Sequence, residues 1–451
     1  MNQLTEFLAN NPHIHHATPE SSDYEDLRMG FIINASRHPA IIVRPRSAED
    51  VAALVPLLTQ NDLPFAVRVG GHDMFGRSQI NDGVTIDLRE ISYVDVDKSA
   101  QTARVGGGVV TMDLLEKLHE HDVVTPFGMT PSVGVLGWST FGGYGLLSPH
   151  YGLGVDQIVG AKIVDAQGII CDADEIMLTA IRGGGGCIGV IVELTLKVYP
   201  KSQTLAGAIF FESKDLALEV EQFNQAYARA KANGLPAPLH LYQAVINGPG
   251  GKSLAVLFMW SSSDMEEGQK WLSRASSWLP VAMSTVQPTT YLDFARFASS
   301  MLPPKTYGTI FTINLFDLTP EVLKVIGAHA KKQPNNPEVL LGIHELRANG
   351  PTESSSRTVY HNRQPHFLLE ILPMASTPEL AAEAVAWGEA FRDDLRKTDP
   401  SNIVPSSYIS LTSPGDSNME SIYGVKYSKL KEIKGLYDPN NVFKSALAQF
   451  Y

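Results

Sequence analysis

The most informative short motif in this chain is Arg68-Val69-Gly70-Gly71-His72-Asp73. Because glycine has no β-carbon, the main chain at such a turn can lie directly against a bound group. Successive main-chain N–H groups there can form a concave site for an anion such as a pyrophosphate. His72 would place a nucleophilic imidazole beside that group. A turn of this composition taken alone is more often purely structural, so the interpretation depends on further motifs.

Further glycine-rich and aromatic segments follow this motif along the chain. They include Gly128-Met129-Thr130-Pro131-Ser132-Val133-Gly134, then Phe141-Gly142-Gly143-Tyr144-Gly145, then Arg182 with Gly183 to Gly186, and finally Tyr437-Asp438-Pro439-Asn440-Asn441-Val442-Phe443. Together they resemble the FAD-linked oxidases of the vanillyl-alcohol-oxidase superfamily, which have a PCMH-type FAD-binding domain, and in particular the berberine-bridge-enzyme-like branch. The resemblance extends from about Pro39 to Phe443, which is nearly the whole chain.

The resemblance implies that FAD is the cofactor and that the first glycine turn holds its pyrophosphate. It also implies a covalent bond between His72 and the 8α-methyl carbon of the flavin, with a plain hydrogen-bond donor as the alternative role. Gly189 and Val190 would lie beside the adenine. The cofactor-binding residues expected in this way are Arg68, Val69, Gly70, Gly71, His72, Asp73, Ser78, Thr130, Pro131, Val133, Gly134, Gly137, Trp138, Gly142, Gly143, Gly145, Gly189, Val190 and Asn441.

A second attachment of the flavin is not expected. Many members of the branch bind the flavin through a cysteine in a Gly-x-Cys-Pro-x-Val-Gly segment, where this chain has Thr130. A hydroxyl is a poor nucleophile for such a bond, and Cys171 and Cys187 lie outside the motif. We therefore predict a single covalent link. Trp138 stands where relatives often have histidine, and both stacking on the cofactor and simple packing are open.

Two segments predict the substrate side of the site. Relatives often carry a Thr-x-Phe-x-His-Arg run, which Thr358–Arg363 matches with the histidine displaced by one position. Tyr360 and His361 are therefore candidates for polar groups over the flavin, with packing or solvent contact as the alternative. Tyr408 is the third candidate catalytic residue, because oxidising relatives often read Tyr-x-Asn-Tyr where this chain reads Tyr408-Ile409-Ser410-Leu411.

Leu411 cannot accept a proton, so any catalytic base must be another residue. The available side chains are Tyr408, Tyr360, His361 and Glu370, and the sequence does not choose between them. A tyrosine would need its ordinary pKa of about 10 lowered by a neighbouring cation. Strand alternation places His366, Leu368 and Glu370 on one face. That face could look into the active site or into water, and water is slightly favoured.

A nicotinamide-binding Rossmann fold is the competing explanation for so many glycines. That fold needs Gly-x-Gly-x-x-Gly at the start of a helix, with an acidic residue about twenty positions later. Gly106-Gly107-Gly108 precedes only a short helix, and none of the glycine runs keeps the required spacing. We therefore reject this fold.

Composition narrows the functional class. A net charge of -12 argues against nucleic acid or an anionic membrane as a partner, since phosphate contacts need clustered Lys and Arg. Two cysteines exclude a disulfide framework. No signal peptide or membrane-spanning stretch is visible, and we expect a cytoplasmic protein. His13, His15 and His16 are expected on a solvated surface and not at a metal, because no acidic or cysteine partner keeps ligand spacing nearby.

The elements that must position these residues form two groups. From Ile41 the pattern is βαβ, with a helix starting at Ser47 and strands near 65–67, 84–88, 93–97, 102–105, 157–164 and 190–199. From Gln203, apolar runs of strand length occur at 205–211, 239–246, 254–260, 309–316, 339–345, 367–372 and 408–411, with helices between several of them. A chain of 451 residues also favours two domains.

We expect an α+β fold in which a two-subdomain FAD-binding domain is joined to a substrate domain with an antiparallel sheet flanked by helices, as the resemblance implies. The expected boundaries are an irregular N-terminal extension over 1–38, the FAD-binding domain over 39–202 and the substrate-binding domain over 203–416. The segment 417–451 should return to the FAD-binding domain.

The resemblance implies an FAD-dependent oxidase, in which a substrate C–H bond delivers hydride to the flavin and O2 reoxidises it. Thr130 and Leu411 favour a small, apolar secondary metabolite over a sugar. One alternative is a redox-neutral cyclase of the same family acting on a polyene, because the usual tyrosine is lost at Leu411. A flavin-loaded binding protein without catalysis is the other, and no specific feature of the sequence favours it.

Overall fold

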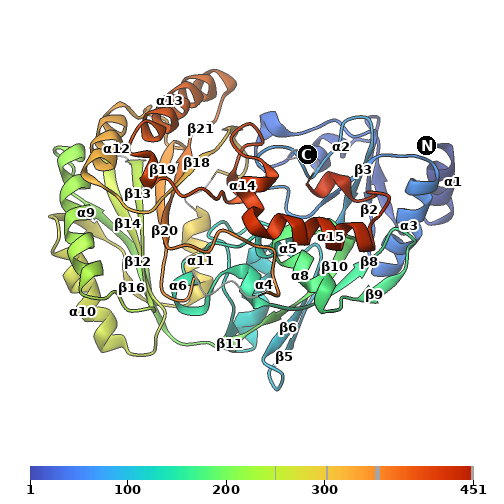
Figure 1. Ribbon diagram of the computed structural model, residues 1–451, viewed down its shortest axis with the longest axis horizontal. Helices are drawn as coiled ribbons and strands as arrows, with labels where there is room; N and C mark the ends of the chain where they lie inside the picture. Colours follow the sequence, from blue (N-terminus) through green and yellow to red (C-terminus); the bar gives the residue numbers. More distant parts are fainter. Residues whose placement is uncertain (249, 301–302, 351–355, 448–451) are drawn as a thin grey trace.

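The computed structural model describes residues 1–248, 250–300, 303–350 and 356–447, which form two halves that face each other (Figure 1). One half contains the first 200 residues or so together with the C-terminal segment. The other half is built around one large sheet. The fold is therefore mixed helix and sheet with an antiparallel sheet in its second half, as expected.

Two sheets form the first half. In the four-stranded sheet, of order β1-β2-β4-β3, β2 and β3 run parallel to β4 while β1 is antiparallel to β2. The five-stranded sheet, of order β5-β6-β10-β8-β9, is antiparallel throughout. The strands are β1 (His15–Ala17), β2 (Ile41–Arg44), β3 (Phe65–Arg68), β4 (Val84–Asp87), β5 (Val94–Asp97), β6 (Thr102–Gly106), β8 (Ile158–Val164), β9 (Ile170–Asp172) and β10 (Val190–Lys197), with a separate pair of β7 (Val123–Val124) and β11 (Tyr199–Pro200).

Helices cover these sheets and carry the loops of the site. The side chain of Ser47 accepts a hydrogen bond from the main-chain N–H of Asp50 and so begins α3, whose apolar face is buried. The helices in the N-terminal part of this half are α1 (Asn2–Asn10), α2 (Tyr24–Arg28), α3 (Ala48–Gln60), α4 (Thr111–Glu120), α5 (Val135–Thr140), α6 (Ser148–Tyr151), α7 (Gly154–Gln157) and α8 (Glu175–Gly184).

An antiparallel sheet of order β15-β12-β14-β13-β19-β20-β18 forms the second half, and β16 adds to β12. Its strands are β12 (Thr204–Phe211), β13 (Leu239–Gly248), β14 (Gly251–Trp260), β15 (Val281–Ser284), β16 (Gln287–Thr289), β18 (Phe311–Leu315), β19 (Leu340–Leu346) and β20 (His366–Leu372). Outside this sheet, β17 (Tyr307–Gly308) pairs with β21 (Met374–Ala375). The helices are α9 (Leu216–Ala232), α10 (Met265–Ser276), α11 (Tyr291–Ser300), α12 (Pro320–Lys332) and α13 (Pro378–Arg396).

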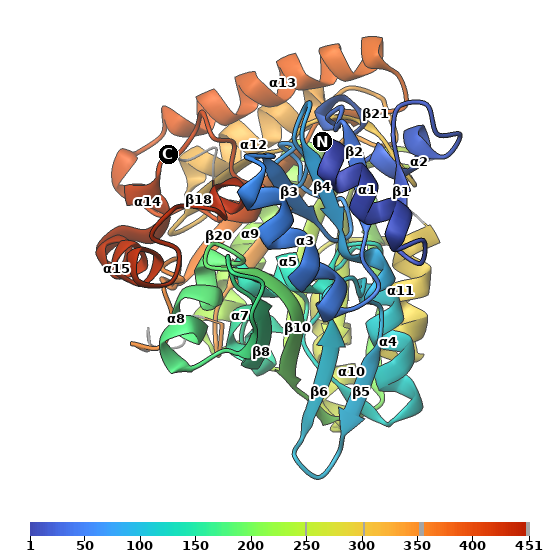
Figure 2. The same cartoon turned by 90° about the vertical axis from the view of Figure 1, so that its right-hand side faces the viewer.

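The outer face of this sheet is covered by α9, α12 and α13, so its other face looks toward the first half (Figures 1 and 2). Thr319 and Thr377 cap α12 and α13, and a proline stands at the first turn of each helix. Phe223, Phe258 and Phe391 belong to the apolar core between the helices and the sheet. The helices therefore leave only one face of the sheet available for a site.

The expectation that residues 1–38 are irregular is wrong. They form α1, β1 and α2, and β1 extends the four-stranded sheet through pairing with β2. Leu4, Leu8 and Ile14 are buried in the same core as α3. The N-terminal segment is therefore an integral part of the first half.

The expectation of a strand over 408–411 is also wrong. Ile409–Leu411 form a 3-10 turn, η4, which the carbonyl oxygen of Tyr408 closes by accepting from the main-chain N–H of Leu411 at 3.0 Å and from the hydroxyl of Thr412 at 2.7 Å. The run Tyr408-Ile409-Ser410-Leu411 is too short for its periodicity to separate a strand from a single turn.

The C-terminal segment returns to the first half, where α14 (Met419–Tyr423) and α15 (Tyr427–Tyr437) lie beside α8 (Figure 1). Leu430 and Ile433 share a buried cluster with Ile181 of α8. The Lys434 ammonium group donates to the Cys187 carbonyl at 2.8 Å and to the Asp438 carboxylate at 2.7 Å. These contacts tie the last helix to the turn after α8.

If the N-terminal segment belongs to the core, Leu8→Ala should lower the free energy of unfolding by about 2–5 kcal/mol, because it opens a cavity beneath α1. Leu8 is 1% exposed. The matched control is Leu436→Ala on α15, where the side chain is 65% exposed and the expected change is within about 0.5 kcal/mol. Urea unfolding followed by tryptophan fluorescence measures both. Equal midpoints for the two variants would show that α1 is not part of the cooperative core.

Candidate cofactor site and substrate cavity

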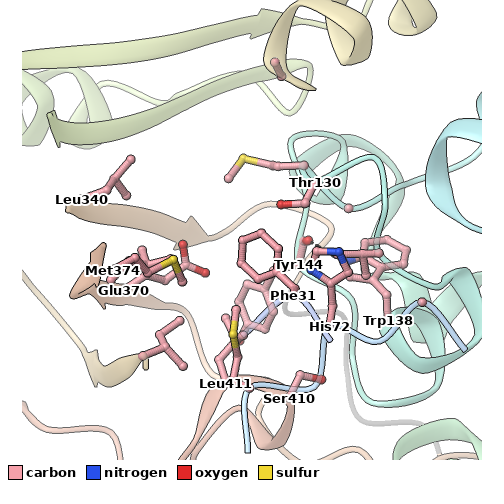
Figure 3. Close-up of a pocket in the computed structure, with 18 of the residues that line it drawn as sticks. Phe31, His72, Thr130, Trp138, Tyr144, Leu340, Glu370, Met374, Ser410 and Leu411 are labelled. Atoms are coloured by element: carbon pink, nitrogen blue, oxygen red, sulfur yellow. Dashed lines mark hydrogen bonds between the residues drawn. The ribbon is translucent and has the colours of Figure 1, made fainter. Parts of the chain in front are cut away.

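A cavity of about 1210 Å³ lies between the two halves and is lined by residues of both (Figure 3). Ligand pockets usually enclose about 300–1,000 Å³, so this one has room for a substrate beside a large cofactor. The first half contributes loops and main chain to the wall. The second half contributes the open face of its sheet.

Gly70 and Gly134 allow two loops of the first half to cross in main-chain contact. A β-carbon at Gly70 would lie 2.7 Å from the carbonyl oxygen of Ser132, and one at Gly134 would lie 2.7 Å from the nitrogen of Gly70. Gly137 in α5 differs, because it lines the cavity and, apart from its two chain neighbours and the backbone of its own helix, no atom of the described residues lies within 4 Å of where its β-carbon would be. The wall thus presents bare main chain to the cavity. These residues fit the close approach of a dinucleotide such as FAD.

His72 lies on this wall with its imidazole held on two sides. Nε2 lies 2.8 Å from the hydroxyl oxygen of Ser132, and the ring stacks on Phe31 with ring centroids 4.5 Å apart and an interplanar angle of 21° (Figure 3). Burial, and then the charge of Arg68, lower the pKa of His72 to about 4. The ring is therefore neutral near pH 7, the form that has a lone pair for a bond to carbon.

Most of the residues expected to bind the cofactor line this cavity. They are Val69, Gly70, Gly71, His72, Asp73, Ser78, Thr130, Val133, Gly134, Gly137, Trp138, Gly189 and Val190. The residues expected at the cofactor that are not part of the lining are Arg68, Pro131, Gly142, Gly143, Gly145 and Asn441. Some of these shape the wall from behind: a β-carbon at Gly142 would lie 2.6 Å from the Tyr360 ring.

Arg68 stabilises the glycine turn from inside the first half. Its guanidinium donates to the carbonyl oxygens of Leu27 and Met29, and burial lowers its pKa to about 10. Gly71 has a φ of 74° and lies against this guanidinium, so a β-carbon there would be both strained and obstructed. In this position Arg68 supports the turn, and its contact with the cofactor stays a prediction.

Trp138 both lines the cavity and packs into the wall. Its indole N–H donates to the carbonyl oxygen of Tyr144 at 3.0 Å, and a β-carbon at Gly154 would lie 2.5 Å from its ring. This hydrogen bond and the close glycine fix the ring in the wall, so packing accounts for the tryptophan, and its exposed face remains available for stacking.

Arg77 connects the glycine turn to the segment after Tyr408. Its Nε donates to the Asp73 carboxylate at 2.7 Å, and its Nη1 donates to the carbonyl oxygen of Ile409 at 3.1 Å. The turn that holds His72 and the turn η4 that lines the substrate side are therefore joined through one guanidinium.

The sheet face of the second half carries a buried carboxylate. Glu370 of β20 lines the cavity, the Tyr242 hydroxyl donates to its Oε2 at 3.3 Å, and His344 Nε2 lies 3.5 Å from the same oxygen. Burial, and then the carboxylate, raise the pKa of Tyr242 well above its ordinary value, so its hydroxyl stays protonated. The slight preference for a solvent-facing strand is wrong: His366, Leu368 and Glu370 are all buried.

Tyr408, of the candidate catalytic residues, lines the cavity. Its hydroxyl accepts a hydrogen bond from the main-chain N–H of Gly143 at 3.4 Å, and its ring lies 4.7 Å from that of Tyr144. Burial raises the pKa of Tyr408. The hydroxyl of Tyr144 lies 2.9 Å from Nε2 of His366, whose pKa burial lowers to about 4. Tyr408 and Tyr144 therefore present protonated hydroxyls.

Tyr360 and His361 are not part of the cavity lining, and their role over the flavin, which the sequence left open beside packing, stays a prediction. The Tyr360 ring is buried behind Gly142, with the Arg363 guanidinium 5.0 Å from its centroid. His361 packs against Gly424 on the side of the C-terminal segment. The segment Thr358–Arg363, in which His361 is displaced by one position relative to the family motif, thus places Tyr360 and His361 outside the cavity lining.

Several wall residues escaped the sequence prediction. Phe31 lies in the segment taken as irregular, and the sequence offered no signal for its role. Tyr144 stands inside one of the glycine motifs and could have been proposed from it. Tyr242 and His344 follow the strand alternation of β13 and β19, but only the pairing of distant strands shows that they meet Glu370.

The described residues contain no group of three or more His, Cys, Asp or Glu side chains that could hold a metal ion. His13 and His15 each lie 2.8 Å from one carboxylate, that of Asp50 and that of Asp23. A helix of sufficient length and apolar character to cross a membrane is also not found among the described residues.

The sequence of this chain matches two family models. The model described as "FAD binding domain" matches residues 39–174, and "Berberine and berberine like" matches residues 415–448. The FAD-linked oxidoreductase aurO of Gibberella zeae is 32% identical over 98% of this chain and 86% of its own length. (R)-6-Hydroxynicotine oxidase of Paenarthrobacter nicotinovorans is 38% identical over 42% of this chain and 43% of its own length.

Solved structures of the same fold support this similarity. The 6-hydroxy-D-nicotine oxidase from Arthrobacter nicotinovorans superimposes with a TM-score of 0.84 at 22% identity, over 96% of each chain. Glucooligosaccharide oxidase from Acremonium strictum, described as carrying a 6-S-cysteinyl, 8α-N1-histidyl FAD, gives 0.82 at 18% identity over 97% of each chain. At these identities the superpositions show a common fold.

The two glycine environments predict opposite effects of an added methyl group. Gly70→Ala should lower the unfolding free energy by about 1–3 kcal/mol, because the β-carbon meets main chain that cannot move aside. Gly137→Ala should leave the flavin-free protein as stable as wild type but weaken FAD binding, since its methyl group enters the cavity. Thermal melts of flavin-free protein and FAD titration by fluorescence quenching measure these effects. Unchanged FAD affinity in Gly137→Ala would place the cofactor away from α5.

Proposed function

This chain belongs to the family of FAD-linked oxidoreductases with a berberine-like C-terminal segment, and we propose that it is an FAD-dependent oxidase of a small, largely apolar secondary metabolite, with O2 as electron acceptor. The observation that carries this proposal is the Glu370 carboxylate on an otherwise largely apolar sheet face, across the cavity from His72 (Figure 3). A carboxylate there can take the proton that leaves an O–H or N–H group when the adjacent C–H bond is oxidised.

FAD, when bound, supplies the two-electron acceptor that takes hydride from the substrate and is reoxidised by O2. The protein holds this group with its glycine wall and, in this proposal, with one covalent bond from His72. The neutral imidazole supports the bond. Thr130 supports a single link, because a hydroxyl stands where a second attachment would need a thiolate.

Glu370 is the proposed proton acceptor. The Tyr242 hydroxyl and the His344 ring orient its carboxylate, and the described lining places no lysine or arginine in direct contact with it. Tyr408 stays protonated at neutral pH because burial raises its pKa. We therefore assign Tyr408 the role of hydrogen-bond donor that orients the substrate, and the role of base to Glu370.

The substrate side of the cavity favours a compact apolar molecule with one polar group. Its aliphatic and thioether side chains include Leu257, Leu340, Leu372, Met374 and Leu411. A sugar would leave many hydroxyls without partners against such a wall, and each unpaired polar group buried there costs about 1–3 kcal/mol. The similarity to an enzyme named for oxidation of 6-hydroxynicotine supports an aromatic substrate with a hydroxyl or amine group.

A flavin-containing, redox-neutral cyclase acting on a polyene is the alternative. It was suggested by the loss of a tyrosine at Leu411, which removes a familiar proton acceptor. Glu370 provides another proton acceptor on the same wall, so this loss no longer argues against oxidation. Net electron transfer to the flavin separates the two functions.

Acid precipitation tests the covalent link. We expect the yellow flavin of wild-type protein to stay with the pellet, and a tryptic peptide containing His72 to carry the added mass of FAD. His72→Ala should bind flavin but release it into the supernatant. Release from the wild type, with normal binding before acid, would contradict the covalent link and leave FAD binding intact.

Anaerobic flavin bleaching tests the oxidase and its base. A panel of hydroxylated aromatic compounds and cyclic amines should include one that bleaches the wild-type flavin. With that compound, Glu370→Gln should slow bleaching by about 10²–10⁴-fold, the usual contribution of a general base. The matched control, Glu389→Gln on the exposed face of α13, should bleach at the wild-type rate. Product formation without bleaching of the flavin would contradict the oxidase proposal and favour the redox-neutral cyclase.

A further inference from the structure

The imidazole of His72 has one nitrogen already engaged by the protein. Its Nε2 lies 2.8 Å from the Ser132 hydroxyl oxygen. His72 is part of the cavity lining, whereas Ser132 is exposed and does not belong to that lining. The bonded nitrogen is therefore engaged by a residue outside the lining of the cavity. Nδ1 is the nitrogen left for a bond to a group inside it.

The main chain around Ser132 is fixed by hydrogen bonds within the protein. The residues on both sides of it are tied to the start of α4: the carbonyl oxygen of Pro131 accepts from Met112 N–H at 2.8 Å, and that of Val133 accepts from Thr111 N–H at 2.9 Å. The carbonyl oxygen of Ser132 also abuts Gly70 in the loop crossing. The main chain that carries the hydroxyl is thus held by a regular element.

The stacking partner restricts the remaining freedom of the ring. Phe31 lies nearly parallel to the imidazole with centroids 4.5 Å apart, so a flip of the ring must occur against this contact. A neutral imidazole has one N–H and one lone pair. If Nε2 carries the proton and donates it to Ser132, the lone pair is on Nδ1, the nitrogen that Ser132 does not engage.

We propose that Ser132 is the positioning residue for covalent attachment of the flavin: its hydroxyl accepts the Nε2 proton in a hydrogen bond, keeps the lone pair on Nδ1, and leads that proton to solvent as the bond forms. This inference rests on the proposed link at His72. The Ser132 hydroxyl is bonded to the ring and acts through it.

The atoms and electrons of this attachment balance with O2 as the oxidant. Nδ1 of His72 gives the electron pair of the new bond to the 8α carbon, and one C–H bond of that methyl group breaks. The imidazole loses its Nε2 proton beside the exposed Ser132 hydroxyl, so the ring returns to its neutral form. Two electrons and two protons are left over, and O2 takes them to form hydrogen peroxide.

The rate of covalent flavin incorporation tests this role. Flavin-free protein from riboflavin-depleted cells is mixed with FAD, quenched with acid at intervals, and assayed for flavin fluorescence in the protein band on a denaturing gel. Ser132→Ala should incorporate flavin about tenfold more slowly than wild type, the factor expected for one lost hydrogen bond of about 1.4 kcal/mol. Total FAD binding before acid should be unchanged.

Two variants separate positioning from structure. Ser132→Thr keeps the hydroxyl and should restore the rate to within about twofold of wild type. Ser139→Ala removes a buried serine hydroxyl from the neighbouring α5, where it has no hydrogen-bond partner among the described residues, and should incorporate flavin at the wild-type rate. Equal slowing by Ser139→Ala and Ser132→Ala would overturn the proposal, because a general disturbance of the loop would then explain both.

The result for the wild-type protein distinguishes the role of Ser132 from the covalent link at His72 on which it rests. Wild-type protein that never retains flavin in acid would overturn both the link at His72 and the role of Ser132. Wild-type protein that retains flavin, with Ser132→Ala equally fast, would overturn the role of Ser132 alone.

Discussion

Main-chain contact between Gly70 and Gly134 is the constraint on which the site depends. With no β-carbon at either position, the turn that carries His72 lies directly on the loop that carries Thr130 and Ser132. That loop is bonded to the start of α4, so the histidine is held against a regular element of the first half. A side chain at either glycine would separate the loops and move the imidazole away from its place in the cavity wall.

The two walls of the cavity have different chemical characters because they come from different kinds of structure. The first half offers main chain, glycine and one neutral imidazole, which suits a large flat group with a pyrophosphate. The second half offers alternate side chains of a sheet, where Glu370 is surrounded by apolar neighbours and protonated hydroxyls. A carboxylate on such a face can accept a proton from a bound substrate.

The glycine-rich wall of the cavity was largely predictable from the sequence, and the wall formed by the sheet was not. Glycine motifs act through the local main chain, so the role of the segments around Gly70 and Gly134 can be predicted from a few consecutive residues. Glu370 meets Tyr242 and His344 only through the register of β13, β19 and β20, which lie far apart in the chain. Strand alternation correctly placed His366, Leu368 and Glu370 on one face of β20, but it could not predict which face of the sheet the helices would cover. The role of Phe31 had no periodic signal at all.

The return of the C-terminal segment has a consequence for biosynthesis. Phe443 and Ala446 line the same cavity as the first glycine turn, and Phe443 packs into the core of the four-stranded sheet. A ribosome must translate the entire second half before these residues emerge, although amino-terminal domains generally fold first as a chain is made. The part of the cavity wall formed by Phe443 and Ala446 is therefore missing until translation has passed residue 446. We expect the cofactor to bind after that point.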